Sequence, residues 1–316
     1  MRQFKRILVG VDLSRGDRLA SSELGEPTRH AMTRARWLAS HAGAELIFFS
    51  ALEISPQAEE LLHEDEGQRR TVEDAANEVL SELVNQAKAE GINARSELVF
   101  GRSWMEIIRA VLREQVDLVV IGTRELGATG RLLFGSTAMK LLRKCPCPVL
   151  VSRPDPEIKD LNILVPSDFS EVSSRALELG VAAGQLTDSR LVLLHCLDDH
   201  VDQRIRLTGM PEEQVEAYKK QAIDEAEGRL REQLAPIDYR TVSGGTQVVV
   251  RRGPAEVEIV QVIEEYEIDL LVMGTIARSG IPGMFIGNTA ERLLPDVRCS
   301  LLAIKPEGFV SPVTLN

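Results

Sequence analysis

The sequence contains the same glycine-rich segment twice. Residues 122–138 read GTRELGATGRLLFGSTA, and residues 274–290 read GTIARSGIPGMFIGNTA. In both copies a Gly-Ser/Asn-Thr-Ala tetrad begins 13 positions after the first glycine. A long self-repeat constrains the architecture more strongly than any local pattern does. The two halves of the chain are therefore expected to share one fold.

The repeat extends well beyond the glycine-rich segment. An offset of 152 positions relates GRSWMEII at 101–108 to GPAEVEIV at 253–260, and VDLVVI at 116–121 to IDLLVM at 268–273. Near the front of each half, RILVGVDLS resembles NILVPSDFS. The repeated unit is about 150 residues long, which is the length of a whole domain. We predict a first domain over 1–155 and a second over 156–316, joined at a proline-containing linker.

Within each half, continuous apolar runs alternate with segments of helical periodicity. In the first half, strands are expected over 6–11, 46–52, 94–100, 117–121 and 148–152. Helices are expected over 28–42, 104–114 and 136–143, with a long helix that ends at Gly91. The second half repeats the pattern, with a strand over 190–197 and a long helix whose apolar stripe includes Val215, Tyr218 and Leu230. Segments 53–68 and 198–212 are expected to be mobile loops. Alternating strands and helices predict a parallel sheet covered on both faces.

Composition and charge argue against several classes of partner. The net charge is −11 and the pI is about 5.1, whereas a nucleic-acid partner requires a basic face. No apolar stretch approaches the length of a membrane span. The N-terminus lacks the apolar core of a signal peptide, so a cytoplasmic location is expected.

No pattern typical of a catalytic or metal site is present. Cys145 and Cys147 have no second Cys or His pair nearby, so they are interpreted as small apolar residues at the start of a strand. Neither a nucleophile elbow nor a His-Glu-x-x-His motif occurs. His195 is expected to be a hydrogen-bonded imidazole of the core. The alternative is a metal cluster formed by His195, Asp198, Asp199 and His200.

Three features of each half meet at the carboxyl edge of the predicted sheet, where open parallel sheets bind ligands. An aspartate follows the first strand, a glycine ends the fourth strand, and Gly-Ser/Asn-Thr starts the last helix. Unpaired N–H groups at a helix start attract anions. In the first half these residues are Asp12, Gly122, Gly135, Ser136 and Thr137. The alternative is that Ser136 and its counterpart Asn288 only cap their helices, while the glycines only turn the chain.

These motifs resemble the universal stress protein family, and most closely its E-type members with two tandem domains. The resemblance covers almost the whole chain. It rests on LVPSDFS at 164–170, GT and RSG within 274–280, FIGNTAE at 285–291, CSLLAIKP at 299–306 and LLRKCPCP at 141–148. It implies a five-stranded, doubly wound α/β domain with strand order 3-2-1-4-5 in each half. It also implies an intramolecular pseudo-dimer, in which 150–152 would lie antiparallel to 302–304, and leaves a further homodimer open.

The resemblance further implies binding of ATP, accompanied by Mg²⁺, at a Gly-x-x-Gly-(nine residues)-Gly-Ser/Thr loop. This chain departs from that pattern at Glu125 and Ala277, which stand where the second glycine belongs. Glu125 places negative charge where phosphate would approach, whereas Ala277 adds only a methyl group. The second half is therefore expected to hold the stronger site. The residues that the resemblance assigns to it are Pro166, Asp168, Ser170, Gly274, Arg278, Gly280, Gly287, Asn288 and Thr289.

The predicted function is that of a non-catalytic stress-response protein. It would bind an adenine nucleotide, require no obligatory cofactor and act through protein partners whose identity the sequence does not reveal. Two alternatives remain open: an interaction scaffold with degenerate nucleotide sites, and a weak ATPase with no identifiable base. Glu125 and Ala277 favour the scaffold, whereas Asp168, Gly274 and Gly287 favour the nucleotide-binding protein.

Overall fold

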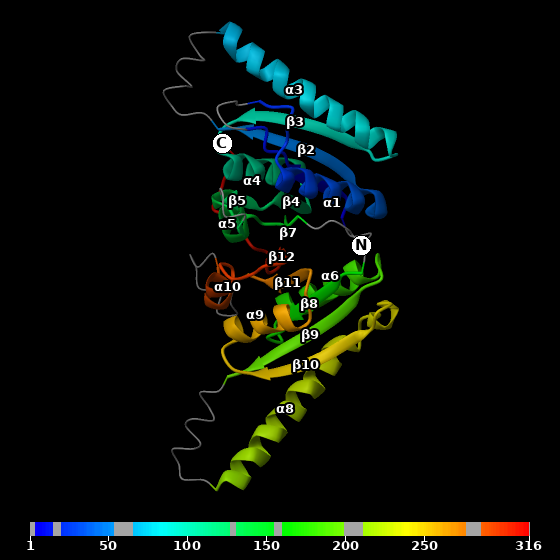
Figure 1. The fold of residues 1–316 in the computed structure, drawn as a ribbon, viewed down its shortest axis with the longest axis vertical. Helices are drawn as coiled ribbons and strands as arrows, with labels where there is room; N and C mark the ends of the chain where they lie inside the picture. The colour runs from blue at the N-terminus through cyan, green and yellow to red at the C-terminus, as the bar shows by residue number, and fades with distance from the viewer. Residues whose placement is uncertain are drawn as a thin grey trace. The chain divides into compact units, whose positions relative to one another are not determined.

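The chain forms two compact units in a computed structural model (Figure 1). One unit comprises Met1–Pro156 and Phe309–Asn316, and the other comprises Glu157–Gly308. The predicted boundary falls among residues 155–159, which are not described, and stays a prediction. The terminal segment, expected in the second domain, belongs to the first unit. The structure describes residues 4–14, 20–53, 66–126, 131–154, 160–198, 211–275 and 286–315.

The first unit is built on a parallel sheet of five described strands. β1 (Arg6–Gly10) lies between β2 (Glu45–Leu52) and β4 (Leu118–Gly122). β3 (Ala94–Phe100) pairs with β2, and β7 (Val149–Ser152) pairs with β4. The resulting order is β3-β2-β1-β4-β7, which confirms the predicted 3-2-1-4-5 arrangement.

Four helices of the first unit follow the predicted pattern. α1 (Glu26–Ala42) packs against β1 and β4 and ends where the sequence predicted, with Gly43 in the left-handed conformation at φ 66°. α3 (Glu66–Ala89) packs against β3. α4 (Ser103–Glu114) contacts β2 and α5 (Ser136–Lys144). The core between helices and sheet is aliphatic, with Ile7, Leu8, Leu46, Ile108 and Leu118 essentially inaccessible to solvent.

The glycine-rich segment of the first unit contains a feature that the sequence did not predict. β5 (Arg124–Leu126) and β6 (Arg131–Leu133) pair as an antiparallel hairpin outside the main sheet. Residues 127–130 between them are not described.

The second unit repeats the same sheet. β8 (Asn162–Pro166) lies between β9 (Arg190–Leu197) and β11 (Leu270–Gly274). β10 (Thr246–Arg252) pairs with β9, and β12 (Ser300–Ile304) pairs with β11, all in parallel. The order β10-β9-β8-β11-β12 is again 3-2-1-4-5. The predicted pairing of 150–152 with 302–304 would join the two units and stays a prediction.

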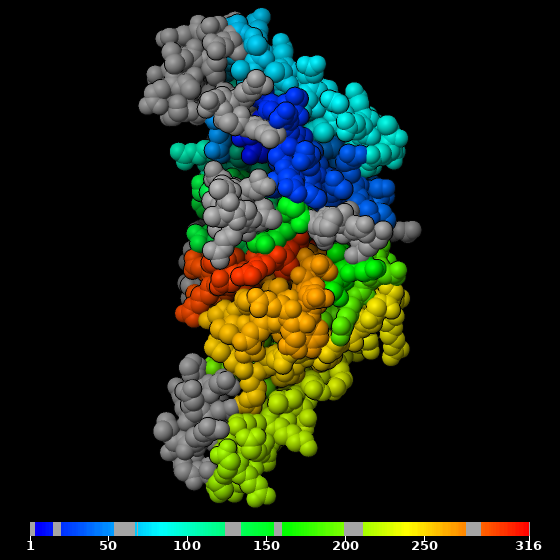
Figure 2. Space-filling view, viewed as in Figure 1, coloured from blue at the N-terminus to red at the C-terminus, as the bar shows by residue number. Residues whose placement is uncertain are grey.

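The helices of the second unit are α6 (Glu171–Gly184), α8 (Glu212–Leu234), α9 (Ala255–Glu265) and α10 (Asn288–Leu293). A 3₁₀ turn over Tyr239–Thr241 was not predicted. Helix α8 corrects one expectation, because Tyr218 is 42% exposed while Val215 and Leu230 are fully buried. Both long helices, α3 and α8, present an exposed side (Figure 2).

The segments expected to be loops lie mostly outside the described residues. Residues 54–65 and 199–210 are not described. The last positions of both segments are helical, since α3 already begins at Glu66 and α8 at Glu212. No helix in the described part of the chain combines the length and apolarity needed to cross a membrane.

A repeated aspartate ties the first and fourth strands together in each unit. Asp117, just before β4, accepts the backbone N–H of Lys5 at 2.7 Å and of Arg6 at 3.2 Å. Asp269, just before β11, accepts the N–H of Asn162 at 2.8 Å. This carboxylate therefore sets the register at the amino edge of the sheet, opposite the edge where ligands bind.

Candidate functional site

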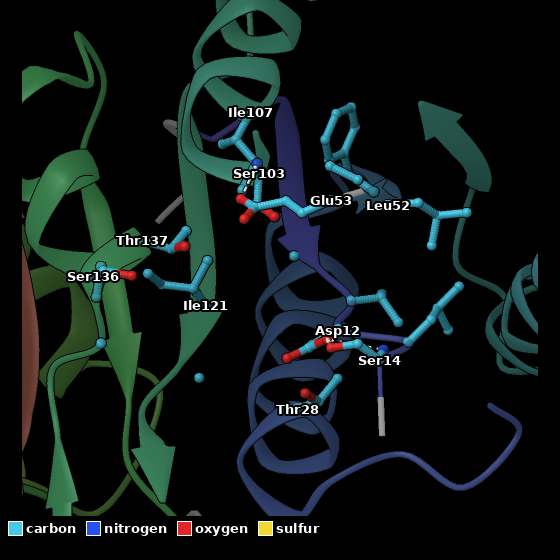
Figure 3. A pocket seen from close by; sticks show the side chains of 18 of the residues that line it. Asp12, Ser14, Thr28, Leu52, Glu53, Ser103, Ile107, Ile121, Ser136 and Thr137 are labelled. Atoms are coloured by element: carbon cyan, nitrogen blue, oxygen red, sulfur yellow. Dashed lines mark hydrogen bonds between the residues drawn. The ribbon is translucent and has the colours of Figure 1, made fainter. Parts of the chain in front are cut away.

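A cavity of about 330 Å³ opens at the carboxyl ends of β1, β2 and β4 in the first unit (Figure 3). Its volume lies at the lower end of the range of about 300–1,000 Å³ that is typical of small-ligand sites. The residues predicted for this half come together here, because the cavity is lined by Asp12, Gly122, Gly135, Ser136 and Thr137. Whether they hold a nucleotide stays a prediction.

Asp12 lies at the exit of β1, and a short local turn fixes its carboxylate. Its Oδ1 accepts the backbone N–H of Ser14 at 3.0 Å and the Ser14 hydroxyl at 2.5 Å. The side chain remains exposed. Figure 3 shows Asp12 and Ser14 on one side of the cavity, and Ser136 and Thr137 on the other.

Glu53 is a cavity residue that sequence reasoning missed. It follows β2, and its Oε1 accepts the backbone N–H of Ser103 at 2.6 Å (Figure 3). Ser103 is the first residue of α4, so this bond satisfies one of the unpaired donors of that helix start. The sequence could have indicated Glu53, because an acidic residue follows the second strand in both halves, Glu53 after β2 and Asp198 after β9.

Thr123 also lines the cavity and was not singled out from the sequence. It is only 7% exposed, and its Oγ1 has no hydrogen-bond partner. Its repeat counterpart Thr275 is hydrogen-bonded, since its Oγ1 accepts from Lys305 Nζ at 2.8 Å. Arg153 stands where the repeat places Lys305, and it is not among the residues that line the cavity. A buried hydroxyl without a partner is uncommon in proteins and calls for an explanation.

The start of α5 forms the donor side of the cavity. Gly135, with φ −66° and ψ 170°, is the N-cap residue, and no side chain caps the helix. Ser136 is the first helical residue, and Gly287 and Asn288 repeat this arrangement at α10. The alternative that Ser136 and Asn288 serve as N-caps is therefore wrong. No acidic side chain lies in the first turn of α5, so its unpaired N–H groups remain suited to an anion or a hydroxyl.

Gly122 shapes the cavity through a close backbone contact. A Cβ atom at this position would lie 2.5 Å from the carbonyl oxygen of Pro27 and 2.7 Å from its carbonyl carbon. Pro27 is in the first turn of α1, and the neighbouring Thr28 lines the cavity. Only glycine allows the start of α1 to approach the end of β4 so closely.

The charges around the cavity are acidic. Asp12 and Glu53 line it, and no Lys or Arg is found among the described lining residues. Aliphatic side chains, among them Ile107 and Ile121, form part of the wall (Figure 3). The cavity therefore combines apolar walls, carboxylate acceptors and the donors of a helix start.

In the second unit, the described members of the predicted site occupy the equivalent edge. Asp168 Oδ1 accepts the N–H of Ser170 at 3.0 Å and its hydroxyl at 2.5 Å, and Ser170 Oγ caps α6. The N–H of Gly287 donates to the carbonyl oxygen of Thr275 at 2.7 Å, which fixes the start of α10 beside the end of β11. The remaining described members lie at the end of β8, at the end of β11 and in the first turn of α10, and they are Pro166, Gly274, Asn288 and Thr289. Ala277, Arg278 and Gly280 lie outside the described residues.

His195 belongs to a stacked cluster in the second unit. Its Nδ1 is 2.8 Å from the carbonyl oxygen of Ser167, and its ring centroid is 4.3 Å from that of Phe169. The guanidinium of Arg229 lies 3.8 Å above the Phe169 ring. His195 is therefore hydrogen-bonded as predicted, although it is only half-buried. Asp199 and His200 of the alternative metal cluster are not described, and no group of three potential ligands occurs among the residues that are.

Cys145 and Cys147 are buried thiols at the end of α5 and the start of β7. Their sulfur atoms are 3.6 Å apart, and neither forms a disulfide. The hydrogen bond with Cys145 and burial both hold the pKa of Cys147 well above its ordinary value. The Cys147 thiol therefore stays protonated, and the burial of both cysteines fits their interpretation as small apolar residues.

Comparisons with known proteins identify the same family over both halves of the chain. The model of the Universal stress protein family matches residues 3–153 and 161–305. Universal stress protein E of Photorhabdus laumondii is 24% identical, covering 99% of this chain and 98% of that protein. Universal stress protein E of Escherichia coli K12 is also 24% identical, over 100% of this chain and 98% of its own length.

Solved structures show the same fold. A functionally unknown protein from Pseudomonas aeruginosa PAO1 has a TM-score of 0.68 at 20% identity, covering 97% of this chain and 94% of that one. A universal stress protein from Archaeoglobus fulgidus has a TM-score of 0.65 at 22% identity, covering 96% of this chain and 99% of that one. With the family model matched twice and the same sheet built twice, the chain belongs to the universal stress protein family, with one domain of that family in each half.

Proposed function

We propose that this stress-family protein binds an adenine nucleotide at the carboxyl edge of its sheets and acts through binding rather than catalysis. The observation that carries the proposal is the cavity of the first unit. It brings Asp12 of the β1 exit and the start of α5 together around one space of about 330 Å³. Both features were expected from the sequence to serve a nucleotide.

The lining residues fit the parts of a nucleotide. The aliphatic side chains of Ile107 and Ile121 offer an apolar surface for a heterocyclic base. The Asp12 carboxylate can accept hydrogen bonds from a ribose hydroxyl or an exocyclic amine. The backbone N–H groups around Ser136 and Thr137 can donate to a phosphate. Mg²⁺ would accompany a triphosphate and neutralise part of its charge.

The second unit is the better candidate for the phosphorylated ligand. Ala277 replaces the loop glycine with only a methyl group, and Asp168 with Ser170 repeats the turn found in the first unit. In addition, the Lys305 ammonium lies within hydrogen-bonding distance of Thr275 at the end of β11. A cation at this edge favours an anionic group.

Regulation through protein partners would follow from ligand-dependent stability. A ligand that binds only the folded state shifts the population of any conformation that it prefers. A partner that recognises that conformation then responds to the nucleotide. The protein would thus report the presence of the nucleotide to its partner without catalysing a reaction.

Calorimetric unfolding with and without Mg-ATP tests the proposal. Saturation at 100 times the dissociation constant should raise the free energy of unfolding by about 2.7 kcal/mol. Ala277→Gly should enlarge the effect and Gly287→Glu should abolish it in the second unit. Absence of any shift at millimolar ATP would instead favour the ligand-independent scaffold. An ATPase would require phosphate release above a protein-free blank that is lost in Asp168→Ala.

A further inference from the structure

The two repeats differ at one buried hydroxyl. In the second unit, Thr275 Oγ1 accepts a hydrogen bond from the ammonium group of Lys305. Lys305 is only 4% exposed. In the first unit, Thr123 Oγ1 is buried beside the cavity without a partner. Leaving a buried hydroxyl unpaired destabilises the folded protein, because the group loses its hydrogen bonds to water. A ligand in the cavity would recover that free energy by bonding to the hydroxyl.

The charges beside this hydroxyl restrict the ligand. Two carboxylates, Asp12 and Glu53, line the cavity, and among the lining residues that the structure describes there is no Lys or Arg. The start of α5 contributes only the equivalent of about half a positive charge. The described lining thus carries more negative than positive charge, which disfavours a phosphorylated ligand relative to an uncharged one.

Resting on the proposed function, we infer that the first unit's cavity takes an uncharged nucleoside in preference to its phosphorylated forms, with the Thr123 hydroxyl as a direct ligand contact. The apolar wall at Ile107 and Ile121 receives the base. The carboxylates of Asp12 and Glu53 accept hydrogen bonds from the ligand's hydroxyl or amino groups. The hydroxyl of Thr123, which can both donate and accept, fixes the ligand at the end of β4.

Isothermal titration calorimetry of the full-length protein with adenosine, AMP and ATP tests this inference. The titrations are made in a Gly287→Glu background, so that binding in the second unit does not contribute. Adenosine should bind at least about tenfold more tightly than ATP, a preference of about 1.4 kcal/mol. AMP should fall between them.

Thr123→Val assigns the contact. It keeps the volume of the side chain and removes the hydroxyl, so adenosine affinity should fall about two- to tenfold, as expected for one lost hydrogen bond. The same substitution should leave the thermal midpoint of the ligand-free protein unchanged or raise it, because it removes an unpaired polar group. Thr275→Val should lower that midpoint, because it takes a partner from the buried Lys305. Thr33→Val on α1, whose exposed hydroxyl donates to the carbonyl oxygen of Arg29, controls for the chemical change itself.

Glu53→Gln tests the charge. Glutamine keeps an oxygen that can accept the Ser103 N–H and removes one negative charge. ATP affinity should rise on the order of fivefold, the effect of one unit charge at close range in water. Adenosine affinity should change by less than about twofold, since adenosine carries no charge.

The outcomes separate the inference from the function on which it rests. If ATP binds as tightly as adenosine and Glu53→Gln has no effect on the ratio, the charge selection is wrong while nucleotide binding stands. If adenosine binds equally to the wild type and Thr123→Val, the assigned contact is wrong. If no adenine compound binds either the parent protein or the Gly287→Glu variant, the proposed function itself is overturned.

Discussion

Gly122 is a residue at which the first unit has no room for an added methyl group. In Gly122→Ala the new Cβ would meet backbone atoms of Pro27 at 2.5 and 2.7 Å, and backbone cannot rotate out of the way as a side chain can. We expect a loss of about 1–3 kcal/mol or more in the free energy of unfolding, the usual range for overpacking. Urea unfolding measures this loss.

Gly228→Ala serves as the matched control. Gly228 lies within α8, and a Cβ there would meet no atom within 4 Å. Replacing an unhindered helical glycine should stabilise the protein by about 0.5–1 kcal/mol. Equal effects of the two substitutions would contradict the role of the close contact at Gly122.

Cys196 predicts a loss of stability in alkaline solution. Burial, aided by Glu258 and opposed by Arg251, raises the pKa of this thiol from 9.0 to about 12. Between these values the unfolded chain releases the proton and the folded protein keeps it, so rising pH favours unfolding. The free energy of unfolding should fall by up to about 1.4 kcal/mol per pH unit through this thiol. Above pH 12 its contribution is lost entirely.

The difference between wild type and Cys196→Ala isolates that thiol, because other groups titrate alike in both proteins. Urea unfolding at pH 8.5, 9.5, 10.5 and 11.5 gives the two stability curves. The curves should converge as pH rises, since only the wild type loses the thiol's contribution. If the two curves stay parallel, the Cys196 thiol has the same pKa in the folded and unfolded states, and the prediction is wrong.

At the residue scale, the sequence predicted the residues whose type and repeat position carry the signal. Asp12, Gly135 and Ser136 were found because they recur in both halves at strand and helix ends. Thr123 could not be recognised, because its counterpart Thr275 is also a threonine and only the coordinates distinguish a paired from an unpaired hydroxyl. Tyr218 was misplaced because helical periodicity puts it on the same stripe as Val215, whereas in the structure Val215 is fully buried and Tyr218 is 42% exposed.

At the scale of elements, the strands and helices were largely predictable and their terminal details were not. Apolar runs located each strand to within about two residues, as is usual for such patterns. The β5–β6 hairpin was missed because the glycines around it indicated a turn rather than paired strands. The predicted start of α5 at Ser136 is confirmed, whereas the alternative that Ser136 and Asn288 are N-caps is wrong, because the glycines before them hold that position.

The repeated aspartates at 117 and 269 give a prediction about the pairing of elements. Asp117→Asn removes the charge from two hydrogen bonds, and Asp269→Asn removes it from the equivalent bond in the second unit. Each substitution should lower the free energy of unfolding by about 1–2 kcal/mol, since charge-assisted bonds are about twice as strong as neutral ones. Urea unfolding measures the loss. Asp74→Asn, exposed on α3, should change stability by less than about 0.5 kcal/mol.

At the scale of the whole molecule, the repeat was the most informative feature of the sequence. Because each half carries the same series of strands and helices, both halves were expected to share one fold. Both sheets indeed have the strand order implied by the family resemblance. The placement of the terminal segment could not be foreseen. Phe309–Asn316 follows the second repeat in sequence, and only tertiary contacts assign it to the first unit.

That assignment predicts which unit depends on the terminal segment. Ser311 and Val313 within it are each only 9% exposed, whereas Val310 is 82% exposed. Deletion of 309–316 should increase amide hydrogen exchange in β1–β4 and leave β8–β12 unchanged. Val313→Ala should reproduce part of the effect and Val310→Ala should not. Faster exchange confined to the second unit would contradict the assignment.

The discontinuity of the first unit also affects the order in which the protein can be completed. A ribosome adds roughly 5–20 residues per second, so roughly 8–30 s separate the synthesis of Pro156 from that of Phe309. The second unit is contiguous and can finish folding as soon as it emerges. The half that is synthesised first is therefore the last to acquire all of its parts. A translation product that stops before Phe309 would contain an incomplete first unit even if its second unit were complete.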